Sequence, residues 1–135
     1  MLESNSPKRA RTMRIAFLSD IHGNTLALDA VLEDITILGG VTASWVLGDL
    51  VTLGPDPVGV LERLSRLDNA VYVRGNTDHY VVADERPGPS ADDVKADFSL
   101  LANFSVVAQQ IGWAQGAVAA TGWLDVLAAM PLEKR

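Results

Sequence analysis

The chain has 135 residues, a formal net charge of −6 and no cysteine. The length suits a single domain, and the acidic balance argues against a nucleic-acid scaffold as partner, because such binding needs a basic surface. The lack of cysteine excludes disulfides, thiolate zinc sites and a cysteine nucleophile, and it fits the cytoplasmic location that we expect. No apolar run reaches the roughly 18–20 residues of a membrane span, so we expect no membrane partner.

The first thirteen residues are polar and carry Lys8, Arg9 and Arg11. They lack the apolar stretch of a signal peptide, so we interpret residues 1–13 as a disordered leader. The folded domain is then expected to occupy residues 14–135.

Three short apolar runs predict strands at residues 14–19, 43–47 and 70–74. Nearly continuous apolar runs are typical of parallel strands that are covered on both faces. The segments between these runs have helical character, which gives the order β-α-β-α-β. This order predicts an α/β fold with a parallel sheet and right-handed crossovers.

Capping residues mark the expected helices between the strands. Asn24 is suited to the N-cap of the first helix, and Gly39-Gly40 ends it. Asp56 is suited to the N-cap of the second helix, with Pro57 at its first position.

Two further helices are expected after the third strand. The first begins at Ser90 or Asp92 and runs to about Ile111. Residues 112–116 contain two glycines and are expected to break it. The last helix then runs to about Met130.

A polar motif follows each predicted strand at its carboxyl end, where open parallel sheets bind ligands. Asp20 and His22 follow the first strand and, in extended backbone, project to the same side. Asp49 and Asn76 follow the second and third strands, each after a glycine that leaves room for a ligand. Carboxylate and imidazole ligands suit Mn, Fe, Zn, Ni or Co better than Ca or Mg.

Each motif alone has an ordinary structural explanation. An aspartate after a strand is usually a cap or turn residue, and a Gly-Asn or Gly-Asp pair usually marks a turn. Their joint occurrence, each closing a separate strand, favours a metal site. Asn24 is foremost a helix cap, and the same position can also help to bind a substrate anion at the helix N-terminus.

The three motifs are Asp20-Ile21-His22, Gly48-Asp49 and Gly75-Asn76-Thr77-Asp78. Together they resemble the calcineurin-like metallophosphoesterase superfamily. Residues 48–57 resemble a bacterial branch of it. The resemblance extends to about Pro131. It implies that Asp20 and His22 bind a first metal ion, that Asp49 bridges two, and that Asn76 binds the second. It further implies two divalent transition metal ions (Mn, Fe, Zn or Ni) and a bridging hydroxide that attacks phosphorus in a small phosphate ester, either a phosphodiester or a phosphomonoester.

The sequence departs from the family at two positions near these motifs. Thr77 stands where many members carry a histidine that is taken as the general acid. His79 is the candidate substitute, and a surface histidine is its simpler explanation. Leu53 stands where the serine/threonine phosphatases of the superfamily carry a phosphate-binding arginine, which argues against that activity.

The later histidines that complete the site in this family have no counterpart among these 135 residues, which contain only His22 and His79. We therefore expect residues 14–135 to form the N-terminal β-α-β-α-β half of the family's α/β/β/α sandwich, followed by two helices. Such a half leaves an uncovered apolar face and an open sheet edge, through which self-association is expected. By itself it is expected to bind one metal weakly and to be inactive.

Two alternative functions can be compared with the metallophosphoesterase interpretation. A non-catalytic member of the same fold, acting as a protein-binding module, would also tolerate an incomplete ligand set. A Rossmann-type nucleotide binder is disfavoured, because residues 19–24 contain no glycine-rich phosphate loop.

Overall fold

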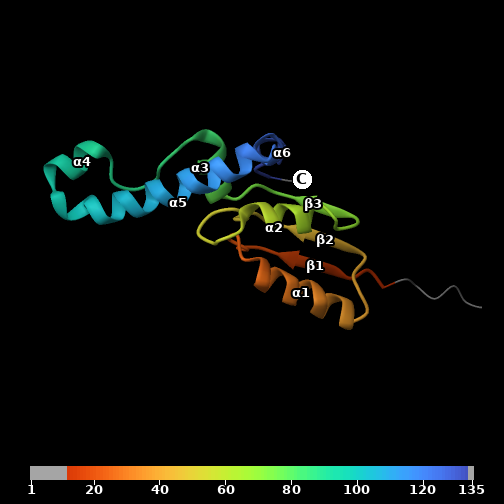
Figure 1. The fold of residues 1–135 in the computed structure, drawn as a ribbon. Helices are drawn as coiled ribbons and strands as arrows, with labels where there is room; N and C mark the ends of the chain where they lie inside the picture. Colours follow the sequence, from red (N-terminus) through yellow and green to blue (C-terminus); the bar gives the residue numbers. More distant parts are fainter. Residues whose placement is uncertain (1–11, 134–135) are drawn as a thin grey trace, which may run out of the picture.

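The structure is a computed structural model that describes residues 12–133 (Figure 1). Most of the expected disordered leader, residues 1–11, lies outside the described residues. The elements are β1 (Ile15–Leu18), α1 (Thr25–Ile37), β2 (Ala43–Val46), α2 (Pro57–Leu64), β3 (Ala70–Tyr72), α3 (Asn76–Ala83), α4 (Ala91–Ala96), a 3₁₀ turn (Phe98–Leu100), α5 (Leu101–Ala120) and α6 (Trp123–Ala129).

The three strands form one parallel sheet in the order β1-β2-β3, which confirms the predicted α/β fold class. The register aligns Phe17 with Trp45, and Trp45 with Val71. Backbone hydrogen bonds continue past the strand ends, with the N–H of Leu47 donating to the carbonyl of Leu18 at 2.8 Å. The pairing of β1 and β2 therefore continues into the loops that contain the polar motifs.

The predicted caps fix the starts of α1 and α2. The side chain of Asn24 accepts from the N–H of Ala27 at 3.0 Å, and that of Asp56 accepts from the N–H of Gly59 at 2.8 Å. Each bond satisfies a backbone donor that the first helical turn would otherwise leave unpaired. Both helices thus begin directly after a loop that connects them to the sheet.

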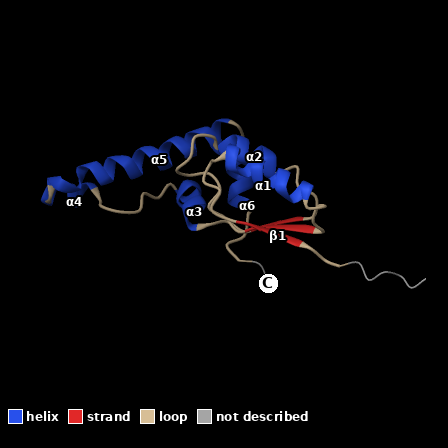
Figure 2. Cartoon of the chain, turned by 90° about the horizontal axis from the view of Figure 1, so that it is seen from below, coloured by secondary structure: helices blue, strands red, loops and turns tan. Residues whose placement is uncertain are grey.

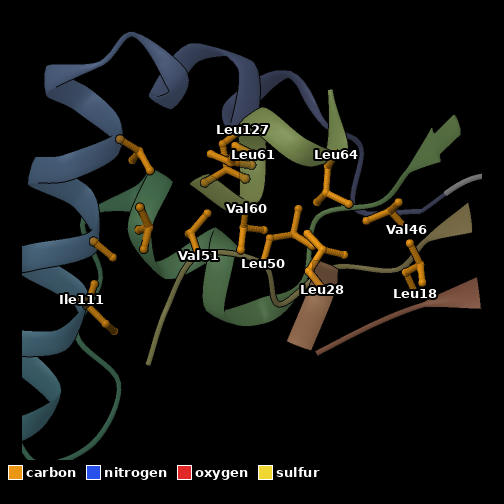
Figure 3. Close-up of a cluster of buried hydrophobic side chains, with 13 residues drawn as sticks. Leu18, Leu28, Val46, Leu50, Val51, Val60, Leu61, Leu64, Ile111 and Leu127 are labelled. Atoms are coloured by element: carbon orange, nitrogen blue, oxygen red, sulfur yellow. The ribbon is translucent and has the colours of Figure 1, made fainter. Parts of the chain in front are cut away.

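The core lies between the sheet and the helices (Figure 3). Leu18 and Val46 come from the sheet, and Val60, Leu61 and Leu64 come from α2; the remaining buried members include Leu28, Leu50, Val51, Val81, Ile111, Ala114, Val118 and Leu127. Leu50 and Val51 belong to the loop after β2 and are completely buried. Their burial anchors the loop that carries Asp49.

One face of the sheet is uncovered in the described part of the chain. Figure 2 shows α1, α2 and α6 on the same side of the strands. On the opposite face Phe17 is 61% exposed and Trp45 is 40% exposed, and their rings meet edge to face at 5.3 Å. The prediction of strands covered on both faces is therefore wrong for these residues, whereas the expected uncovered apolar face is present.

The second half of the chain differs from the sequence prediction in its helix boundaries. Gly112 and Gly116 lie inside α5 and do not break it, although each costs about 1 kcal/mol relative to alanine. The burial of Ile111, Ala114 and Val118 on one face of α5 outweighs that cost. The break falls instead at Gly122, which has a φ of +79°.

Further features of the second half were not foreseen. Helix α3 was not predicted, and the helix expected from about residue 90 is divided by the 3₁₀ turn into α4 and α5. Helix α4 and the first part of α5 project away from the sheet (Figures 1 and 2). Within residues 12–133, no helix combines the length and the apolar character that crossing a membrane requires.

We expect the chain to self-associate through the uncovered face and the adjoining sheet edge. Replacing Trp45 by threonine keeps a residue that favours strands and removes the largest exposed ring of this face, so the monomer fraction should rise. Light scattering at tens of micromolar measures this. Trp113→Thr is the matched control, because Trp113 is also exposed but lies on α5. A wild-type chain that is already monomeric would contradict the expectation.

Candidate metal centre

The loops after β1 and β2 are joined by backbone hydrogen bonds. The N–H of Asp20 donates to the carbonyl of Gly48 at 3.1 Å, and the N–H of His22 donates to that of Asp49 at 2.9 Å. The N–H of Gly23 adds a third bond, to the carbonyl of Leu50, at 2.7 Å. The two loops therefore extend the pairing of their strands, and the motif residues are fixed side by side.

Three of the four predicted metal-ligating residues have left-handed backbone conformations. The φ angles are +56° for Asp20, +49° for His22 and +56° for Asp49. The expectation that extended backbone projects Asp20 and His22 to one side is therefore wrong. Such conformations cost on the order of 1 kcal/mol each outside glycine, and they occur most often where the surrounding structure enforces them at functional sites.

The structure brings Asp20, His22 and Asp49 together. One ligand atom from each residue lies within 4.8 Å of the others. Nε2 of His22 is 3.8 Å from Oδ1 of Asp20. Two carboxylates and one imidazole form a donor set that suits a divalent transition metal ion.

The ring of His22 is oriented by Thr52, a residue of the loop after β2. Nδ1 of His22 lies 3.4 Å from the hydroxyl of Thr52, whose side chain is buried. This contact occupies one ring nitrogen and leaves Nε2 facing Asp20. Histidines that bind metals are commonly held in this way through their other nitrogen.

Asp49 is held from the first turn of α3. Its Oδ1 accepts a hydrogen bond from the hydroxyl of Thr77 at 2.9 Å and another from the N–H of Thr77 at 3.1 Å. Both residues are half-buried. The third motif thus contacts the second through the side chain of Thr77, the residue that stands where many family members carry a histidine.

The remaining predicted site residues are placed as follows. Asn76 is exposed and is the first residue of α3, next to Thr77. Asn24 caps α1 as predicted. His79 faces Glu85, with Nε2 of His79 at 3.9 Å from Oε1 of Glu85, and so it contacts a residue outside the cluster. A role for Asn76 in metal binding, for Asn24 in substrate binding and for His79 as general acid stays a prediction.

The glycines of the second and third motifs are required by the contact between their loops. A side chain at Gly48 would collide with the backbone of Gly75, and one at Gly75 would collide with the carboxylate of Asp49. Gly48 also has a φ of +92°. The glycines therefore permit two loops to touch, which differs from the expected role of leaving room for a ligand.

A buried carboxylate links the same two loops. Asp78 has no exposed surface, and its Oδ1 accepts from the N–H groups of Leu50 and Val51 at 2.8 and 3.2 Å. Its Oδ2 accepts from the N–H of Gly75 at 3.0 Å. Burial raises the pKa of the Asp78 carboxyl, the three backbone donors lower that pKa, and the charge of Asp49 raises it further, so that the pKa is raised overall.

Sequence reasoning therefore missed three supporting residues: Thr52, Thr77 and Asp78. For Asp78 a signal was available, because an acidic residue three positions after Gly75 is typical of the first turn of a helix. For Thr52 and Thr77 no local pattern identifies the partner, which comes from a distant part of the chain.

Comparisons with known proteins agree with this arrangement. Residues 13–131 match the family model of calcineurin-like phosphoesterases. A symmetrical bis(5'-nucleosyl)-tetraphosphatase of Baumannia cicadellinicola subsp. Homalodisca coagulata is 38% identical over 72 residues, which are 53% of this chain and 25% of that protein.

Solved structures extend the comparison to the fold. A metallophosphoesterase from Sphaerobacter thermophilus superposes with a TM-score of 0.62 and 30% identity, over 90% of this chain and 42% of that one. A hypothetical protein from Pyrococcus horikoshii OT3 superposes with a TM-score of 0.65 over 89% of this chain and 48% of that one, and at 20% identity it supports the fold alone.

The fold and the three motif loops define a phosphoesterase-like α/β protein. The chain belongs to the calcineurin-like phosphoesterase family, as the resemblance in its sequence implied. The matched segment covers about a quarter of the curated relative described above, and the chain covers less than half of each of the two solved structures.

We expect Asp78→Asn to lower the free energy of unfolding by about 1–3 kcal/mol, the cost of leaving a buried polar group unsatisfied. An asparagine oxygen can accept from Leu50 and Val51, but its NH₂ group would face the N–H of Gly75. Urea denaturation measures the change. Asp34→Asn on the exposed surface of α1 is the matched control and should stay within about 0.5 kcal/mol of wild type. Equal stability of Asp78→Asn and wild type would refute the linking role.

Proposed function

We propose that the loops after β1, β2 and β3 form a site for divalent transition metal ions that serves the hydrolysis of phosphate esters. The observation that carries the proposal is the convergence of Asp20, His22 and Asp49 within 4.8 Å in left-handed backbone conformations. A tight turn can explain why a single residue such as Asp20 has a left-handed conformation. It does not explain why ligand atoms of three residues from two loops lie close together.

Within this proposal each residue has a defined task. Asp20 and His22 would hold one metal ion, and the contact of His22 with Thr52 leaves Nε2 free to face that ion. Asp49 contacts His22 of the first loop and Thr77 of the third, so its carboxylate would be shared by two ions, and Asn76 would offer an amide oxygen to the second. When bound, such ions lower the pKa of coordinated water and neutralise the charge of the phosphoryl oxygens.

The substrate contacts follow from the neighbourhood of the cluster. Asn24 is the N-cap of α1 and lies only two residues after His22, so the N-terminal end of that helix is close in sequence to the cluster and can receive a phosphate oxygen. His79 is the candidate donor of a proton to the leaving group. Its contact with Glu85 does not favour this role, and an activated diester needs less acid assistance than an alkyl monoester.

The substrate class is proposed from chemistry and from relatives. A site of this kind acts on small phosphate esters, either phosphodiesters or phosphomonoesters. The curated relative carries the name of a bis(5'-nucleosyl)-tetraphosphatase, which makes a dinucleoside tetraphosphate the first natural compound to assay.

Metal binding tests the proposal most cleanly. Calorimetric titration of the metal-stripped chain with Mn²⁺ should show binding that Asp49→Asn weakens by about 10-fold or more, because the substitution removes a charged ligand. His22→Ala should weaken it as well. Asp34→Asn carries the same change of charge on the exposed surface of α1 and should bind like wild type.

Hydrolysis is then assayed with Mn²⁺ and a nitrophenyl phosphodiester, followed by the dinucleoside tetraphosphate. Any activity should fall in Asp49→Asn and persist in Asp34→Asn. Mn²⁺ binding that is the same in wild type, Asp49→Asn and His22→Ala would contradict the proposal and favour the non-catalytic, protein-binding alternative.

A further inference from the structure

Thr77 makes two contacts with a single oxygen atom of Asp49. Its hydroxyl donates to Oδ1 at 2.9 Å, and its backbone N–H donates to the same atom at 3.1 Å. Among the described residues, the hydrogen bonds received by the Asp49 carboxylate come from Thr77 alone and end on Oδ1. The second carboxylate oxygen, Oδ2, therefore keeps its lone pairs for another partner.

The surroundings leave Asp49 little freedom to turn. Its backbone has a φ of +56°, its carbonyl accepts from the N–H of His22, and the missing side chain of Gly75 leaves space that the carboxylate fills. An aspartate carboxylate has a broad torsional range when it is not held. The two bonds from Thr77 remove that range.

We infer that Thr77 is a positioning residue that fixes Asp49 so that the carboxylate binds metal through Oδ2 alone. The inference rests on the proposed metal site and deepens it. It also gives a role to the departure noted in the sequence. Thr77 stands where many family members carry a histidine, and in this chain that position orients the proposed metal ligand Asp49. Supporting contacts of this type change metal affinity by about 10–100-fold.

Two substitutions separate the hydroxyl from the rest of the residue. Thr77→Val keeps the branched shape and the backbone N–H but removes the hydroxyl donor. Thr77→Ser keeps the hydroxyl donor and removes a methyl group. We expect Thr77→Val to weaken Mn²⁺ binding by about 10-fold, and Thr77→Ser to restore most of the affinity.

The measurement is a calorimetric Mn²⁺ titration of the full 135-residue chain, together with thermal unfolding of each metal-free variant. Thr36→Val is the matched control, because the hydroxyl of Thr36 also donates to an oxygen, the carbonyl of Leu32, but on α1 away from the cluster. It should leave the Mn²⁺ affinity unchanged.

Acting through Asp49 has a specific signature. In a background that carries Asp49→Ala, adding Thr77→Val should lower the remaining Mn²⁺ affinity by less than twofold. An equally large loss in that background would show that Thr77 does not act through Asp49 and would overturn the inference.

The two proposals fail in different ways. If wild type binds Mn²⁺ and Thr77→Val binds it equally well, or if Thr77→Val and Thr77→Ser lose the same affinity, the role of Thr77 is refuted while the metal site stands. If wild type takes up no Mn²⁺, the proposed function is refuted and the role of Thr77 with it.

Discussion

The carboxylate of Asp78 is the constraint on which the arrangement of the second and third loops depends. It is completely buried, and it accepts hydrogen bonds from Leu50 and Val51 on one side and from Gly75 on the other. A charge in such a place is costly unless it is paired or hydrogen-bonded, and backbone N–H groups meet that requirement here. Because the loop after β2 is also tied to the loop after β1, the position of one carboxylate influences all three motifs.

This network explains how left-handed backbone is maintained at Asp20, His22 and Asp49. Each of these conformations lowers the stability of the fold by a small amount. The burial of the apolar side chains of Leu50 and Val51 beside them raises the stability and offsets this cost. The strain is thus placed where the loops must turn sharply to face one another. Its consequence is that ligand atoms of Asp20, His22 and Asp49 lie within 4.8 Å of one another.

Much of the fold was predictable from local patterns. The apolar runs gave the three parallel strands, and Asn24 and Asp56 marked the starts of two helices, because these features depend on neighbours in sequence. The helix boundaries after β3 were not predictable in this way. There the packing of Ile111, Ala114 and Val118 decides that α5 continues through two glycines, and packing is not visible in a local pattern.

The same distinction between local patterns and distant contacts applies to the candidate site. The sequence pattern predicted Asp20, His22 and Asp49 as metal ligands from their residue types and their place after strands, and the structure brings these three side chains together. The residues that orient them were missed, because Thr52 and Thr77 act across 30 and 28 positions of the chain. The conformation of Asp20 and His22 was also missed, because it follows from backbone bonds to a different loop.

The central claim is that three separate loops form one metal site, and paramagnetic broadening in solution NMR tests it most directly. Substoichiometric Mn²⁺ should broaden the amide signals of Asp20, His22, Asp49 and Thr77 first, while diamagnetic Zn²⁺ shifts the same signals without broadening them. Helix α4 provides an internal comparison, since it carries the exposed acidic residues Asp92 and Asp93 and lies away from the sheet (Figure 1). Broadening that appears first on α4, or that reaches only one of the three loops, would contradict the account.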